Sequence, residues 1–175
     1  MRTRRGFLIL AGAAFAAAPV VAHTPYGQWV VYRRKHLLIG AHRGDAATYA
    51  RAKDVVAGLD RELPEARARV ARGPRPQRIA SLMTTGQLSL AVLADKEAGR
   101  MARAEPPFES YRPTPLRALA ALGEGYFLFA SPDFPARHAR MVTEALDHGG
   151  LAAPPEATAI EVHEGAASYW RAGGG

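Results

Sequence analysis

The sequence predicts an α/β fold with three layers, in which helices cover both faces of a mainly parallel sheet. Two observations predict it. Short apolar runs of strand length alternate with amphipathic stretches of helix length, and glycine or proline separates most of them. The 175 residues, 48% hydrophobic and 22% charged, also suffice for one domain with a proper core. Alternating strands and helices favour parallel strands joined by helical crossovers.

The first half of the chain supplies three predicted strands. Residues 36–39 are typical of a central strand, and residues 47–63 of a helix whose large apolar residues recur near every 3.6 positions until Pro64. We expect a short second strand over residues 68–73 and a second helix over residues 77–85, with Gly86 as its stop. Residues 88–93 predict the third strand.

The second half is predicted to complete the sheet. A helix over residues 95–104 and a loop over residues 105–115 come first. Residues 116–122 and 126–131 then flank a Gly-Glu-Gly turn, which predicts a pair of strands. Phe134 and Pro135 open a last long helix that reaches about Asp147. A linker follows, and residues 164–170 predict a terminal helical turn.

The first 22 residues have the layout of an export signal. Arg4 and Arg5 precede an apolar run that extends to Ala18, and this start resembles the twin-arginine consensus. We therefore expect a twin-arginine signal peptide over residues 1–22, a single domain over residues 23–175, and delivery to the periplasm. An uncut signal would remain as an anchor, but its apolar run is short for a transmembrane helix.

Composition argues against several classes of function. The chain has no cysteine, so disulfides and thiolate chemistry are excluded. Its net charge of +7 favours an anionic partner, yet basic residues cluster beside an aromatic one only in "YRRKH" at residues 32–36, so we expect no nucleic acid. The six histidines lack the spacing of metal ligands. No nucleophile elbow or phosphate loop is present, so we expect neither enzymatic activity nor a cofactor.

Two strand-to-helix corners are the candidate binding sites, because ligands of such sheets lie beyond the carboxyl ends of the strands. A helix N-terminus at each corner presents unpaired amides and a positive dipole end, which suit a carboxylate. The candidate ligand-binding residues are His42, Arg43, Thr48 and Tyr49 at the first corner and Arg75, Gln77 and Arg78 at the second.

Each corner also has a purely structural interpretation. At the first, Asp45 is a preferred N-cap residue that would accept hydrogen bonds from the same amides, with Arg43 paired to it. At the second, Arg75 and Arg78 could be solvated surface residues. The aromatic residues near the two ends, Tyr26 and Trp29 together with Tyr169 and Trp170, could either cover an edge of the sheet or form a docking surface.

Four segments in order resemble the TAXI family of solute-binding proteins, the receptors of certain TRAP transporters. They are "LLIGAHRGDAATYARAKDVVAGLDRELP" (37–64), "ARVARGPRPQRIASLMTTGQLSLAVL" (68–93), "LRALAALGEGYFLFASPDFPARHARMVTEAL" (116–146) and "VHEGAASYWRAG" (162–173). The resemblance implies one lobe of a type 2 periplasmic binding protein, with amino acids or dicarboxylates as typical ligands. Family members are about twice as long and have two lobes, so this chain corresponds to a half-site.

Two functions follow as expectations. The first is periplasmic binding of a small anionic solute for transport or sensing, with a membrane transporter component or a second copy of the chain as possible partners. The second is a ligand-free accessory module that docks on another exported protein. The residues alone leave both open, together with the identity of the solute.

Overall fold

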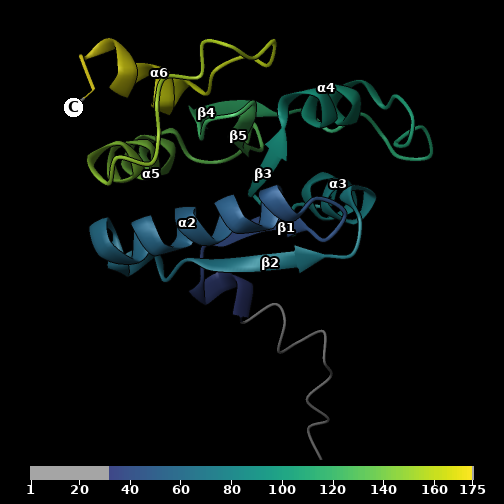
Figure 1. Ribbon diagram of the computed structural model, residues 1–175, viewed down its shortest axis with the longest axis horizontal. Helices are drawn as coiled ribbons and strands as arrows, with labels where there is room; N and C mark the ends of the chain where they lie inside the picture. The colour runs from purple at the N-terminus through teal and green to yellow at the C-terminus, as the bar shows by residue number, and fades with distance from the viewer. Residues whose placement is uncertain (1–31, 175) are drawn as a thin grey trace, which may run out of the picture.

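The computed structural model describes residues 32–174, so the expected signal over residues 1–22 lies outside the described part of the chain. Within it the chain forms a five-stranded sheet with the order β2-β1-β3-β5-β4 (Figure 1). The strands are β1 (Leu38–His42), β2 (Arg69–Gly73), β3 (Leu90–Ala94), β4 (Arg117–Ala121) and β5 (Tyr126–Ala130). The helices are α2 (Ala46–Glu62), the short 3-10 helix η1 (Pro64–Ala66), α3 (Pro76–Thr84), α4 (Asp95–Arg103), α5 (Ala136–His148) and α6 (Glu164–Arg171).

The sheet is mixed, with its parallel strands on one side. β1 pairs in parallel with both β2 and β3, whereas β5 pairs antiparallel with both β3 and β4. Four strands therefore run one way and β5 runs the other. The tight turn between β4 and β5 is the reason, because Gly123, Glu124 and Gly125 all have positive φ and fold the chain straight back. The prediction of a mainly parallel sheet holds for β1, β2 and β3.

Helices cover both faces of the sheet, as predicted. α2 and α5 pack with Ile39, Leu90 and Val92 in one hydrophobic cluster, and α6 adds Ala166 to it. α3, α4 and the loop residue Phe108 pack with Ala91 and Leu93 in a second cluster on the opposite face. Successive strand residues thus point to opposite faces, and both faces are apolar because both are covered.

Two strands begin two residues later than the sequence predicts. β1 starts at Leu38 after a helical turn at residues 32–35. It also extends three residues beyond its predicted end, to His42, so this histidine lies on the strand rather than in the following turn. β3 starts at Leu90 because the amides of Gln87 and Leu88 both donate to the carbonyl of Leu82 and close the end of α3. The first residue of the predicted strand, Leu88, therefore belongs to a helix-terminating turn.

The C-terminal segment covers the β4 edge of the sheet. Ala153 and Val162 form isolated bridges to β4, and the indole of Trp170 donates to the carbonyl of Leu119 at 3.0 Å. The Tyr169 hydroxyl donates to Asp147 at the end of α5. The edge-covering interpretation is thus confirmed for Trp170, whereas the hydroxyl of Tyr169 contacts α5. Tyr26 and Trp29 lie outside the described residues. None of the described helices combines the length and the apolar character that a membrane crossing requires.

Candidate functional site

The carboxyl ends of β2, β1 and β3 lie side by side, so the turns and helices that follow them share one edge of the sheet. The amide of Arg43 donates to the carbonyl of Gly73, which holds the β1–α2 turn against the β2–α3 turn. A Cβ built on Gly44 would lie 3.9 Å from Pro76, the first residue of α3. The two predicted corners are therefore neighbours, but their helix N-termini differ.

The first corner is already occupied by a side chain. Asp45 is the N-cap of α2, and its carboxylate accepts hydrogen bonds from the Ala47 amide at 2.8 Å and from the Thr48 hydroxyl at 3.0 Å. The Tyr126 hydroxyl donates to the same carboxylate at 2.6 Å from the start of β5. An anionic solute would meet this carboxylate directly. The N-cap interpretation of Asp45 is thus confirmed, although the partners of its carboxylate do not include Arg43.

The other candidate residues of the first corner have structural contacts. Thr48 is fully buried, and its hydroxyl is held by Asp45. The ring of Tyr49 lies between two cations, with Arg72 at 4.3 Å and Lys53 at 5.3 Å from its centroid. The structure therefore does not bring Thr48 and Tyr49 together around a shared hollow.

The electrostatics of Asp45 predict how stability depends on pH. Its partial burial alone would raise the pKa, but hydrogen bonds from Tyr126, Ala47 and Thr48 outweigh that effect and hold the pKa of Asp45 below its ordinary value. A lowered pKa in the folded state contributes stability that is present above the unfolded value of about 3.9. That contribution is lost as the pH falls through the folded pKa.

The Asp45→Asn variant should therefore have a free energy of unfolding about 1–2 kcal/mol lower than the wild type at pH 7. The difference should begin to shrink below about pH 4, where the carboxyl of the unfolded wild type is protonated, and should vanish once the pH has fallen through the lowered pKa of the folded state. Urea titrations followed by circular dichroism at several pH values measure it. Asp54→Asn, an exposed position on the same helix, is the control. A difference that grows toward acid pH would contradict the assignment.

The second corner is an open helix N-terminus. Arg75 is the N-cap of α3, and Pro76 occupies the first turn. Among the described residues no side chain caps this helix. A hollow of about 330 Å³ lies beside it, walled by the β2–α3 turn, by α3 and by the loop that follows α4. Its lining residues are Pro74, Arg75, Gln77, Arg78, Ser81, Pro107, Ser110 and Tyr111. The predicted residues Arg75, Gln77 and Arg78 thus come together, and no acidic side chain is among the described residues of the lining.

Gln77, which lines this hollow, also has a buried polar atom. Its side-chain oxygen is buried without a hydrogen-bond partner among the described residues. Because the oxygen and nitrogen of a side-chain amide can exchange places by a flip, Gln77 can offer either an acceptor or a donor here. An unpaired buried amide costs free energy that a bound polar group would recover.

His42 lies beneath this edge rather than in the hollow. It is 2% exposed, and its Nε2 atom lies 3.0 Å from Oε1 of Glu97 in the first turn of α4. The two groups are not aligned as a hydrogen bond, so these two atoms and Nδ1 of His42 are buried without hydrogen-bond partners in the described part of the chain. The pair joins the end of β1 to α4 and does not line the hollow at α3.

Sequence reasoning missed four contributors to this edge. Ser81 could have been found, because it lies one helical turn after Gln77 and Arg78 and so shares their side of α3. Glu97 follows the third strand, so topology alone places it near the edge. Ser110 and Tyr111 belong to a loop that no local pattern connects to α3. Among the described residues, no group of three or more histidine, aspartate or glutamate side chains could hold a metal ion.

No protein-family model matches this chain, and no curated protein matches it significantly.

Proposed function

We propose that this protein binds a small anionic solute, of the amino acid or dicarboxylate class, at the N-terminus of α3. In this proposal the protein is exported to the periplasm by the twin-arginine route, where it serves transport or sensing. Resemblance to the TAXI receptors supports the solute class, and Arg4 and Arg5 in the first 22 residues support the route. A transporter component of the TRAP type is the corresponding membrane partner.

The uncapped first turn of α3 is the observation that carries the proposal. The positive end of the helix dipole and the amide of Gln77 attract an anion; Pro76 has no amide hydrogen, and the amide of Arg78 donates to the carbonyl of Arg75. Among the described residues no side-chain carboxylate caps this turn, in contrast to Asp45 at α2. Arg75 and Arg78 are exposed cations at this turn, where they are unfavourable for the helix itself. An anion that meets both arginines and the amide of Gln77 removes that cost.

The polar groups around the turn suit a solute with a second polar substituent. Ser81, Ser110 and Tyr111 bring hydroxyls to the same hollow. Beside it, the amide oxygen of Gln77 is buried without a hydrogen-bond partner among the described residues. The loop after α4 walls one side, whereas a second lobe or a second copy of the chain would be needed to enclose the solute fully. We therefore expect weak binding, roughly in the micromolar to millimolar range.

Calorimetric titration of the purified protein with a panel of amino acids, dicarboxylates and inorganic anions tests the proposal. At least one organic anion should bind. Arg75→Gln should weaken the binding of that anion about tenfold or more, because the variant removes a charge-assisted contact. Arg140→Gln is the matched control, since it removes the same charge from an exposed position on α5, on the other face of the sheet. Its affinity should stay within about twofold of the wild type.

Two results would contradict solute binding at α3. In one, no member of the panel binds, and the protein instead co-purifies with another exported protein, as the accessory-module alternative requires. In the other, a solute binds, but Arg75→Gln and Arg140→Gln weaken its binding equally. That result would show that the affinity depends on the net charge of the protein and not on the position of Arg75.

A further inference from the structure

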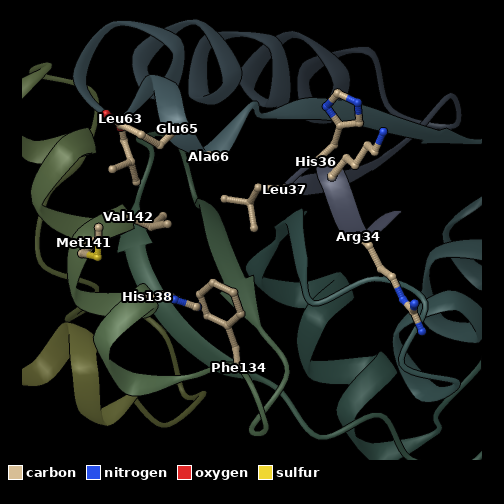
Figure 2. A pocket seen from close by; sticks show the side chains of 11 residues that line it. Arg34, His36, Leu37, Leu63, Glu65, Ala66, Phe134, His138, Met141 and Val142 are labelled. Atoms are coloured by element: carbon tan, nitrogen blue, oxygen red, sulfur yellow. The ribbon is translucent and has the colours of Figure 1, made fainter. Parts of the chain in front are cut away.

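The basic cluster at residues 32–36 lies at the opposite end of β1, far from the hollow at α3. A cavity of about 350 Å³ opens there, between the start of β1, η1 and the first half of α5. Figure 2 shows the side chains of Leu37, Leu63, Phe134 and Val142 around this cavity, with Met141 at its margin. The proposed anion site leaves this cavity without a role.

Apolar groups make the floor of the cavity. Val142 and Phe134 are 1% and 7% exposed and belong to the hydrophobic core. Met141 is 36% exposed, one of the few large hydrophobic side chains of the described residues that reach the surface. An apolar group of a ligand would therefore contact well-ordered core side chains, and the cavity lies at the lower end of the range for small-molecule sites.

The rim of the cavity carries a positive balance. Arg34 and Lys35 contribute two full charges, and His36 and His138 contribute two imidazoles. Glu65 is the one acidic residue among the described residues that line it. Nδ1 of His36 lies 3.1 Å from the carbonyl of Arg67, so this nitrogen donates its proton and Nε2 is left as the outward ring atom. In Figure 2 Arg34 and His36 both lie on the side of Leu37 away from Met141.

We propose that this cavity binds an aliphatic monocarboxylate, with its hydrocarbon chain over Leu37, Phe134 and Val142 and its carboxylate at the basic rim. The apolar floor selects a hydrocarbon chain, and the two cations of the rim select a negative head group over a positive one. Arg34, Lys35 and His36 of the cluster "YRRKH" thus acquire a function that does not involve nucleic acid. The cavity is separate from the hollow at α3, so either site can exist without the other.

A nuclear magnetic resonance titration of the full chain with butanoate, hexanoate and octanoate tests this proposal. The amide signals of Leu37 and Met141 should shift saturably with each ligand. Each added methylene should tighten binding about fourfold until the cavity is full, as expected for burial of hydrocarbon. Hexylammonium, with the same chain and the opposite charge, should bind about two- to fivefold more weakly than hexanoate. The double variant Arg34→Gln, Lys35→Gln should lose this preference.

Met141→Glu supplies the second test, because it sets a carboxylate at the margin of the cavity without touching the core. Met141→Glu should weaken the binding of hexanoate about fivefold or more. Arg140→Gln changes the net charge by the same amount on the same helix, and its affinity for hexanoate should stay within about twofold of the wild type. Arg75→Gln should leave the affinity for hexanoate unchanged, which distinguishes binding in this cavity from solute binding at α3. Affinity that does not change with chain length, or unshifted signals of Leu37 and Met141, would overturn the proposal.

Discussion

Replacing Gly165 with alanine is expected to lower the free energy of unfolding by about 3 kcal/mol or more. Gly165 lies in the first turn of α6, where that helix crosses α5. A Cβ built on it would lie 2.0 Å from the carbonyl oxygen of Ala136 and 3.0 Å from the Cβ of Ala139. Both contacts are with the backbone or first side-chain atom of α5, so no flexible side chain can move aside, and the two helices must separate.

Urea denaturation followed by circular dichroism measures this loss. Gly99→Ala in α4 is the matched control, because its Cβ would meet only the guanidinium of Arg103, at an ordinary 3.4 Å. Alanine favours helix more than glycine does, so Gly99→Ala should be neutral or stabilising by up to about 1 kcal/mol. Equal stability of Gly165→Ala and the wild type would show that α6 does not pack on α5 in this way.

Replacing His163 with alanine should cost about 2–4 kcal/mol of the free energy of unfolding, since two buried hydrogen bonds are lost. His163 is 2% exposed and is the N-cap of α6. Its Nδ1 accepts from the amide of Gly165 at 3.2 Å, so its Nε2 carries the proton that is donated to the carbonyl of Phe134 at 2.8 Å. Alanine leaves that amide and that carbonyl unpaired in a buried position.

Differential scanning calorimetry measures the loss of stability, and hydrogen exchange of the α6 amides shows whether the loss arises in α6. Exchange should accelerate first in α6, because the segment loses both its cap and its attachment to the start of α5. His148→Ala, an exposed position at the end of α5, should change stability by less than about 0.5 kcal/mol. Unchanged exchange in α6 of His163→Ala would contradict the assigned role of the imidazole.

Much of the fold was predictable from the sequence because its signals are local. The apolar period of α2, the alternation of strands with helices and the Gly-Glu-Gly turn at residue 123 depend on neighbouring residues. The N-cap role of Asp45 is equally local, since the side chain reaches an amide two residues on. The open N-terminus of α3 follows from the same rule, because Arg75 cannot cap a helix.

The remaining features arise from contacts between distant segments. Insertion of β5 between β3 and β4 depends on pairings such as Leu93 with Phe127, which no local pattern specifies. The wall that Tyr111 adds to the hollow and the approach of Glu97 to His42 are of the same kind. β1 starts later than predicted because the basic residues before it form a helical turn instead of extended chain.

The coverage of the β4 edge bears on how copies of this protein behave when they meet. Residues 150–174 occupy the backbone groups of β4 through Ala153 and Val162, so a neighbouring molecule finds no free strand there to extend. At the opposite margin, exposed arginines at positions 67, 69 and 72 repel a like-charged second β2. Loss of the tail would therefore leave an alanine-rich strand ready for edge-to-edge aggregation.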